Sequence, residues 1–476
     1  MHLSKKIGLF VAPLLFFVIN NLPFELISAD ADAVIAVAVW MILWWITEAV
    51  SISVTALLPL ILFPLLKIMS IEEVGANYGS PIIFLFFGGF ILALALEKVN
   101  LHRRIALSII KITGTSPNKV VLGFMIATAV LSMWISNTAT AVLMLPIALS
   151  VIGLLVNDDD GFTKSDRNFA LSVMLGIAFS ANAGGIATVI GTPPNSVMIG
   201  LLENEYNIEI SFLKWMIIGV PFSAAMIAIS YVVLVKWLYP SRQLKFSASR
   251  NVINEELRKL GPMSGKEKMV LVIFAVTVFL WIFRTVINEI FPALKLNDTI
   301  ISMAAAIAMF SLPYNLKKGD FIIEWKDTQK LAWGILILFG GGLALAKGMS
   351  VSGIVDVVAN AIASSEITVL FTAVLLITLM LFMTELMSNV ALVAVLAPVV
   401  AGIAIGLEIP ILYLLIPVTM ASSCAFMLPM ATPPNAIVFA SGYIKVHEMA
   451  RVGFFLNIIA VLILVLMFQF VLPLVF

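Results

Sequence analysis

The chain is a succession of long apolar segments separated by short polar ones. Most apolar runs span about 15–25 residues, the length that crosses a hydrocarbon core of roughly 30 Å. They lie near residues 7–22, 32–50, 53–66, 80–98, 119–151, 169–200, 211–238, 268–290, 298–313, 330–347, 369–406, 411–442 and 452–476. This pattern predicts an all-α integral membrane protein.

Two of these segments, 119–151 and 369–406, are too long for one crossing and too short for two. Each has polar residues near its middle, Ser136-Asn137-Thr138 in the first and Ser388-Asn389-Val390 in the second. Two half-length helices that meet at a polar tip explain both features. Such a tip is tolerated in a membrane only where protein or a water-filled cavity surrounds it. We therefore expect two re-entrant hairpins.

Composition agrees with a membrane protein and excludes several functions. The 476 residues are 62% hydrophobic and 12% charged, with a mean hydropathy of +1.11, whereas soluble domains carry roughly 25% charged residues. The net charge of +1 gives no indication of nucleic-acid binding, and a single cysteine, Cys424, excludes an intramolecular disulfide. An intramembrane enzyme is disfavoured because the apolar segments contain no His or paired Asp that could supply acid–base chemistry.

Basic residues indicate the sidedness of the connections, because cytoplasmic loops carry an excess of Lys and Arg. With a cytoplasmic N-terminus, the basic residues collect in inner connections: Lys98, Arg103, Arg104, Lys111, Lys119, Lys236, Arg242, Lys245, Arg250, Arg258, Lys259, Lys266, Lys268, Lys317, Lys318, Lys326, Lys330, Lys445 and Arg451. The outer connections are acidic or neutral, with Asp30, Asp32, Glu203, Glu205, Glu209, Asp356 and Glu366. This arrangement predicts about eleven transmembrane helices plus the two hairpins, with the C-terminus outside. We expect the first helix to be retained, because Ala29-Asp30-Ala31 is a poor signal-peptide cleavage site.

Three motifs recur in the same order in the two halves, roughly 32–238 and 268–476. They are Phe87-Gly88-Gly89-Phe90 with Gly340-Gly341-Gly342-Leu343, Ser136-Asn137-Thr138 with Ser388-Asn389-Val390, and Gly191-Thr192-Pro193-Pro194-Asn195 with Ala431-Thr432-Pro433-Pro434-Asn435. Five crossings and one hairpin per half make the second copy enter from the opposite side. This is the inverted-repeat architecture of secondary transporters, whose sites lie near the midplane where broken helices of the two halves meet.

The recurring motifs offer ligands for small ions. Pro-Pro in mid-membrane must break a helix, which exposes carbonyls suited to a cation and a helix N-terminus suited to an anion. At the hairpin tips, Asn and the hydroxyls can bind a cation through oxygen and a carboxylate through N–H and O–H. The alternatives are a proline kink tolerated for packing and hydrogen bonds between helices. We interpret Glu48 as interfacial and Glu385 as a structural residue that binds free backbone near its tip.

At these motifs the chain resembles the divalent-anion:sodium symporter family, which includes sodium–dicarboxylate, sodium–citrate and sodium–sulfate transporters. The resemblance extends to Trp44-Trp45-Ile46-Thr47-Glu48-Ala49, to Glu97–Arg104, to Trp134–Thr140 and to Thr384-Glu385, and it covers nearly the whole chain. It implies a homodimer in which a mobile transport domain works as an elevator against a scaffold. The expected scaffold is 1–118 and 268–368, the transport domain is 119–238 and 369–476, and 239–267 is a cytoplasmic linker.

The resemblance also implies the site residues. One sodium site is expected at Ser132, Ser136, Asn137 and the Gly191 carbonyl, and a second at Thr384, Met387 (backbone oxygen only), Asn389 and the Ala431 carbonyl. Substrate carboxylates are expected at Asn137, Thr138, Asn389, Val390, Thr192, Pro193, Thr432 and Pro433. Val390 departs from a strict Ser-Asn-Thr pair and bears on the choice of substrate.

Together these features predict sodium-coupled import of C4-dicarboxylates such as succinate, malate and fumarate, with sodium as the co-transported ion and membrane lipid as the surrounding partner. Citrate and sulfate remain rival substrates, and sodium-independent dicarboxylate exchange is a second hypothesis within the same fold.

Overall fold

The computed structural model describes residues 3–21, 25, 27–114, 116–156, 163–241, 249–315, 320–364 and 367–476. Five residues used for the expected topology lie outside these ranges: Arg242, Lys245, Lys317, Lys318 and Glu366. The described chain is helical apart from one short antiparallel pair, β1 (Pro313–Asn315) with β2 (Asp320–Phe321). The predicted all-α class is therefore confirmed.

The first half consists of α1 (Leu3–Asn20), α2 (Ala29–Thr47), α3 (Ile52–Thr55), α4 (Leu58–Leu65), α5 (Ile71–Tyr78), α6 (Pro81–Lys98), α7 (Leu101–Thr113), α8 (Pro117–Ser132), α9 (Asn137–Val156), α10 (Lys164–Ile186), α11 (Pro193–Tyr206), α12 (Phe212–Val232) and the π-helical η1 (Val233–Leu238). Proline stands in the first turn of α6, α8 and α11, where its missing N–H costs no intrahelical bond.

The second half consists of α13 (Ser249–Leu260), α14 (Gly265–Ile290), α15 (Asp298–Ser311), the 3-10 helix η2 (Trp325–Lys330), α16 (Trp333–Val351), α17 (Ile354–Ala363), α18 (Val369–Met383), α19 (Asn389–Gly406), α20 (Ile411–Ser422), α21 (Pro433–Phe439), α22 (Val446–Leu466), the π-helical η3 (Met467–Val471) and α23 (Leu472–Val475). Several of these helices begin with a capping box; in α14, for example, the Ser264 hydroxyl and the Glu267 carboxylate each bind the other's backbone N–H.

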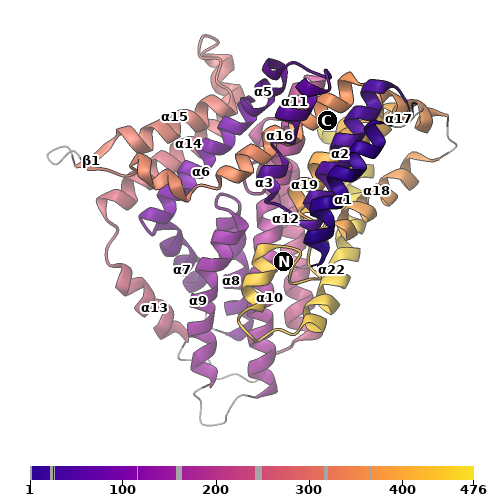
Figure 1. The fold of residues 1–476 in the computed structure, drawn as a ribbon. Helices are drawn as coiled ribbons and strands as arrows, with labels where there is room; N and C mark the ends of the chain where they lie inside the picture. The colour runs from indigo at the N-terminus through magenta and orange to yellow at the C-terminus, as the bar shows by residue number, and fades with distance from the viewer. Residues whose placement is uncertain are drawn as a thin grey trace.

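Both predicted hairpins are present as pairs of helices joined by a tight tip, although their second helices, α9 with 20 residues and α19 with 18, are longer than the half-length helices that the sequence suggested. The first is α8 and α9 with residues 133–136 between them, and the second is α18 and α19 with residues 384–388 between them. Figure 1 places α8 and α9 in the lower half of the view and α18 and α19 in the upper half. The two hairpins thus approach the middle of the molecule from opposite ends, as an inverted repeat requires.

The apolar segment 53–66 is divided between two short helices. α3 ends at Thr55 and α4 begins at Leu58. Pro59 in the first turn of α4 has no N–H to donate to the Thr55 carbonyl four residues earlier, and its ring crowds that turn, which favours a break here. Within the described residues, eight helical stretches are long and apolar enough to cross a membrane, and several other apolar helices are shorter. The expected number of eleven crossings stays a prediction.

Ion pairs attach the expected linker to the first half. α13 lies within 239–267, and its Glu256 pairs with Arg103 of α7. The neighbouring Arg104 pairs with Glu267 at the start of α14 at 2.7 Å. The linker is therefore fastened to α7 over its second part.

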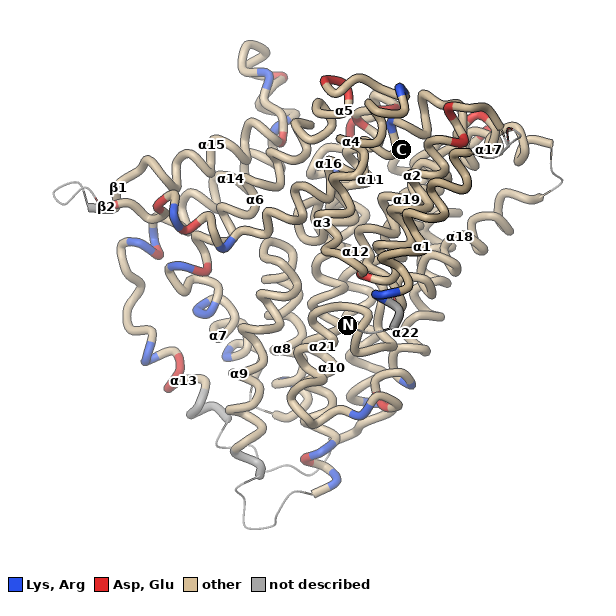
Figure 2. The backbone as a smooth tube through the Cα atoms, in the orientation of Figure 1, with Lys and Arg blue, Asp and Glu red and all other residues tan. Residues whose placement is uncertain are grey.

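Charged residues lie mainly at the two ends of the helices. In Figure 2, red segments gather toward the top near α5 and α17, whereas blue segments are frequent around α7 and α13 and toward the bottom. The tubes of the central helices are almost entirely tan. This distribution agrees with a central apolar zone that is solvated by lipid; the orientation of the termini stays a prediction.

Candidate substrate and ion site

A cavity of about 460 Å³ lies where the two hairpin tips meet the two breaks in α10–α11 and α20–α21. Its wall contains all eight residues predicted to contact substrate: Asn137, Thr138, Thr192, Pro193, Asn389, Val390, Thr432 and Pro433. Five further wall residues are Ser136, Gly191, Met387, Ala431 and Asn182. Residues from opposite halves of the sequence therefore surround one space.

The first hairpin tip brings three oxygens together behind the cavity wall. The Ser132 hydroxyl, fully buried at the end of α8, lies 2.6 Å from Asn137 Oδ1 and 2.7 Å from the Ala181 carbonyl of α10. A hydroxyl has one proton and can donate to only one of two acceptors at a time. The third oxygen is thus an acceptor in excess, which is an arrangement that favours a cation.

The second tip repeats this geometry with different residues. The buried Thr384 hydroxyl lies 2.6 Å from Asn389 Oδ1 and 2.6 Å from the Ser422 carbonyl of α20. The same two contacts, a side-chain amide oxygen five residues ahead and a carbonyl of the adjacent broken helix, recur in both halves. This similarity of hydrogen bonding supports the internal repeat independently of the motifs that suggested it.

Both tips end in a helix N-terminus that faces the cavity. α9 begins at Asn137 and α19 at Asn389, and the Ser136 and Ser388 hydroxyls accept only the N–H of the third helical residue. Among the described residues, the N–H groups of the first two positions in each helix have no hydrogen-bond acceptor. Free N–H groups and the helix dipole make such an end a binding place for an anion.

The breaks contribute fewer N–H groups than the sequence suggested. Pro193 and Pro194 fill the first two positions of α11, as Pro433 and Pro434 do in α21, and proline has no N–H. The Asn435 N–H, next in line, meets the Thr432 hydroxyl at 3.4 Å. The expectation of an anion-binding N-terminus therefore fits the hairpin tips better than the breaks.

The asparagine after each Pro-Pro pair repairs the broken backbone. Asn195 Nδ2 donates to the carbonyls of Thr188 at 2.9 Å and Ile186 at 3.4 Å, and Asn435 Nδ2 donates to Leu428 at 3.0 Å and Ala425 at 3.1 Å. Both amides are fully buried. They hold carbonyls that the proline break leaves without a helical partner, so their role is to support the site.

Close approach of the Asn137 side chain explains one glycine beside the first tip. A side chain at Gly185 would place its Cβ 2.4 Å from Asn137 Oδ1. The hairpin can therefore touch α10 at this level only because residue 185 has no side chain.

Glu385 has the structural role that the sequence indicated. Its carboxylate accepts the N–H groups of Phe426 (2.9 Å), Met427 (2.9 Å) and Leu428 (3.1 Å), and Nδ2 of Asn457 at 2.8 Å. The first three belong to the unwound stretch between α20 and α21. A carboxylate is the strongest available acceptor for such N–H groups in a dry interior. Glu48, by contrast, is exposed and pairs with Lys5 at 3.4 Å.

The first half fastens its tip differently. The break there spans only 187–192, and the Thr188 hydroxyl donates to the Met133 carbonyl of the hairpin tip at 2.5 Å. In both halves the broken helix donates and the hairpin tip accepts, but the side chain comes from the broken helix in the first half and from the hairpin in the second.

An aromatic stack supports the first tip from outside the cavity. Trp134 lies two residues before Ser136, and its ring is parallel to those of Phe212 and Trp281, with centroid distances of 5.9 Å and 6.4 Å. Phe212 and Trp281 stack at 4.4 Å. Trp281 Nε1 also donates to the Asp298 carbonyl at 3.1 Å. The stack joins the hairpin tip to α12, α14 and α15.

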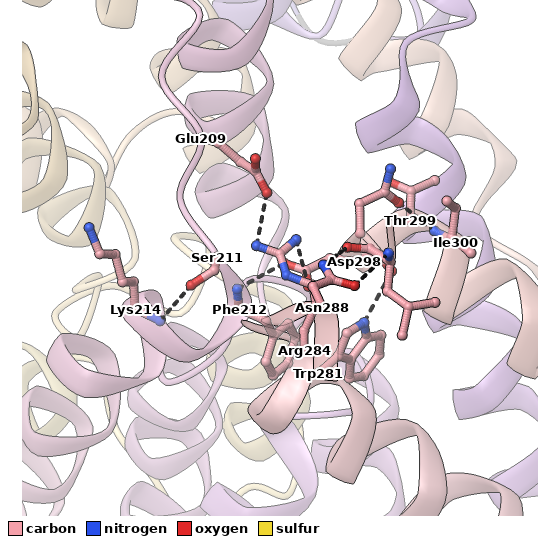
Figure 3. A network of polar contacts seen from close by, with 12 residues as sticks. Glu209, Ser211, Phe212, Lys214, Trp281, Arg284, Asn288, Asp298, Thr299 and Ile300 are labelled. Carbon is pink, nitrogen blue, oxygen red and sulfur yellow. Dashed lines mark hydrogen bonds and ion pairs between the residues drawn. The ribbon is translucent and has the colours of Figure 1, made fainter. Parts of the chain in front are cut away.

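An ion-pair network lies next to this aromatic stack, as Figure 3 shows. Arg284 is buried and pairs with Glu209 at 2.8 Å and with Asp298 at 3.2 Å. Asp298 also accepts the Phe212 N–H at 2.8 Å. Sequence analysis did not single out Arg284, although an arginine inside an apolar segment is itself a signal that a partner lies nearby.

A second cavity, of about 290 Å³, adjoins this ion-pair network. Glu203 of α11 lines it together with Glu209, Arg284 and Asp298. Burial raises the pKa of Glu203 to about 7, and the negative charges of Glu209 and Asp298 add to the effect while Arg284 opposes it.

Comparison with known proteins identifies the family. A family model described as the sodium:sulfate symporter transmembrane region matches residues 3–475. The chain belongs to this family of divalent-anion:sodium symporters. It is therefore a multi-pass membrane transporter and not an enzyme, as the sequence predicted.

Curated relatives in this family align over nearly the whole chain. A protein of Staphylococcus saprophyticus named sodium-dependent dicarboxylate transporter SdcS is 40% identical over 479 residues, covering 99% of this chain and 92% of its own length. Its namesake in Staphylococcus aureus (strain bovine RF122) is 40% identical over 473 residues, covering 98% of this chain and 90% of its own.

Two solved transporter structures are similar in fold. The Alcanivorax borkumensis YdaH transporter has a TM-score of 0.54 at 11% identity, covering 83% of this chain and 87% of its own. Neisseria gonorrhoeae MtrF has a TM-score of 0.50 at 11% identity, covering 98% and 94%. At this level of identity, the likeness supports the fold of the symporter and nothing more.

Proposed function

We propose that this symporter couples sodium to the import of C4-dicarboxylates such as succinate, malate and fumarate. The observation that carries the proposal is the pair of long-helix N-termini, α9 and α19, on one cavity. Each end is equivalent to roughly half a positive charge and presents free N–H groups. Two such ends, one from each half of the chain, match an anion that has a carboxylate at each end.

Val390 stands where the first tip has a threonine, and its lack of a hydroxyl is compatible with this arrangement. Thr138 and Val390 occupy equivalent positions on the two tips, and both line the cavity. Because the second tip still offers its backbone N–H groups, the carboxylate on that side has hydrogen-bond donors without a hydroxyl. The hydroxyl of Thr138 adds a donor on the first side only.

Sodium is proposed to bind the oxygen clusters behind the tips. One cluster contains Ser132, Ser136, Asn137 and the Gly191 carbonyl; the other contains Thr384, Met387, Asn389 and the Ala431 carbonyl. The acceptor oxygen left without a proton beside the Ser132 hydroxyl, and likewise beside the Thr384 hydroxyl, supports a cation. Hydroxyl, amide and carbonyl oxygens are ligands suited to a hard cation. A sodium ion beside each helix N-terminus would also add positive charge next to a bound carboxylate, which gives a physical basis for coupling. The relatives named sodium-dependent dicarboxylate transporters support both ligands.

We further propose an elevator mechanism in a homodimer, with 119–238 and 369–476 moving as a transport domain against the scaffold of 1–118 and 268–368. The close association of both tips with both breaks supports movement of these elements as one unit. The proposed orientation in the cell membrane has the N-terminus in the cytoplasm and the C-terminus outside.

Uptake into proteoliposomes tests the function. Radiolabelled succinate should accumulate with an inward sodium gradient, and uptake should fall to background when choline replaces sodium. Unchanged uptake in choline would indicate sodium-independent exchange instead. Stronger competition by citrate or sulfate than by unlabelled succinate would assign one of those anions as the substrate.

A further inference from the structure

One buried amide crosses from the first half of the site to the second. Asn182 follows Ala181 on α10, and its side chain is 1% exposed. Its Nδ2 lies 3.1 Å from the Thr432 hydroxyl, 3.2 Å from the Ala425 carbonyl and 3.3 Å from Asn435 Oδ1. All three acceptors belong to the second broken helix, whereas Asn182 itself belongs to the first.

The contact has no mirror-image counterpart. The amides of Asn195 and Asn435 donate only to carbonyls of their own halves. In the part of the chain that the structure describes, no side-chain amide or hydroxyl of the second broken helix donates a hydrogen bond to α10 or α11. The internal repeat therefore does not predict the role of Asn182, and no motif in the sequence marks it.

Asn182 is well suited to this position because of its donors. The unwound stretch from Ser423 to Thr432 leaves oxygens facing α10, and the NH₂ group supplies two hydrogens to them from a rigid helix. Asn182 Oδ1 is buried without a hydrogen-bond partner among the described residues. The amide is thus held through its donors, on the side that faces the second half.

We propose that Asn182 is a positioning residue that sets the place of Thr432 on the cavity wall and so makes the two broken helices one binding unit. The proposal rests on the proposed function, because Thr432 is there assigned to the substrate. It predicts that the first half of the chain controls how well the second half binds its end of the substrate.

A double-mutant cycle on uptake tests the inference. Asn182→Ala and Thr432→Val should each raise the substrate concentration for half-maximal uptake about tenfold, as expected for a lost buried hydrogen bond. The double variant should be no worse for uptake than either single one, because the Asn182–Thr432 hydrogen bond, to which the proposal assigns the effect, is lost in both. Thr192 is the equivalent threonine of the first half and has no contact with Asn182 in the proposal. In the double variant Asn182→Ala/Thr192→Val, the two increases in half-saturating concentration should therefore multiply. Multiplying effects for Asn182 and Thr432 would overturn the proposal.

A matched control lies two residues away. Ser180 is on the same helix, fully buried, and its hydroxyl has no hydrogen-bond partner among the described residues. Ser180→Ala should therefore leave the half-saturating concentration unchanged. If Asn182→Ala does not yield folded protein, Asn182→Ser, which retains one hydroxyl donor, replaces it and should show the same non-additivity with Thr432→Val.

A thermal-unfolding cycle on the same purified variants separates positioning from general stability. The effects of the two substitutions on the unfolding midpoint could be non-additive while their effects on the half-saturating concentration multiply. That result would mean that the contact between Asn182 and Thr432 is structural only, and it would overturn the positioning role. The uptake cycle is run with whichever of succinate, citrate or sulfate the wild type transports. A wrong substrate assignment therefore shows in the wild type alone, whereas a wrong role for Asn182 shows in the cycle.

Discussion

Replacing Glu385 by Gln changes one acceptor oxygen into a donor at the second break. In the wild type the carboxylate accepts three backbone N–H groups and the Asn457 amide, at 2.8–3.1 Å, and the residue is 3% exposed. Glutamine can retain the three contacts of Oε1, to Phe426, Met427 and Asn457. Its NH₂ group then faces the Leu428 N–H, which loses its acceptor.

The loss of folding free energy in Glu385→Gln follows from these contacts. An unsatisfied buried N–H costs about 1–3 kcal/mol, and the remaining hydrogen bonds weaken because their acceptor is no longer charged. Loss of the buried negative charge offsets part of this cost. We expect a clear fall in the thermal midpoint. The unwound stretch also leads to Ala431, so sodium activation should weaken, about tenfold for each 1.4 kcal/mol that falls on the proposed second sodium site.

The assay combines thermal unfolding in detergent with uptake at graded sodium concentrations. Met133→Leu is the matched control, because Met133 is the equivalent position on the first tip and contributes its backbone carbonyl, to the Thr188 hydroxyl. Wild-type stability and wild-type sodium activation in Glu385→Gln would refute the reasoning, since both effects derive from the same lost acceptor.

Three other predictions concern the tips and the ion-pair network. Thr138→Val should weaken substrate affinity roughly ten- to a hundredfold, because a hydrogen bond to a charged group is worth about 1.5–3 kcal/mol, whereas Val390→Ala should cost several-fold at most; competition uptake measures both. Arg284→Gln should lower the thermal midpoint markedly, since removal of one partner of a buried pair with Asp298 costs about 3–5 kcal/mol. Burial raises the pKa of Glu203 to about 7, so the folded state favours its protonated form; stability should decline as the pH rises through about 7, and Glu203→Gln should reduce this decline.

Each of these predictions has a contrary result. Equal losses in Thr138→Val and Val390→Ala would mean that both positions contribute packing only. Glu289→Gln is a control for Arg284, because Glu289 is exposed near the end of the same helix; an equal fall in its midpoint would assign the effect to the helix end. If stability depends on pH in Glu203→Gln as it does in the wild type, other groups cause that dependence.

The sequence by itself determined the membrane class, the two hairpins and the repeat. These depend on properties that are local or that recur: a run of apolar residues has a length, a Pro-Pro pair breaks a helix wherever it stands, and 119–151 cannot be one ordinary crossing. The structural role of Glu385 was also predictable, because a carboxylate in an apolar segment needs donors, and an unwound stretch has free N–H groups to give.

Only the tertiary structure decided how the two halves are joined. Asn182 donates to residues more than two hundred positions away, and Arg284 of α14 pairs with Glu209 in the connection that precedes α12. Such contacts depend on which helices pack together and on how their side chains face, and neither periodicity nor composition contains that information. The repeat does not contain it either, since the equivalent positions Glu385 and Met133 bind their broken helices differently: Glu385 accepts through its carboxylate and Met133 through its backbone carbonyl. Two similar halves can share a backbone pattern and still differ in side chains, because each break has its own length and leaves its own set of unpaired groups.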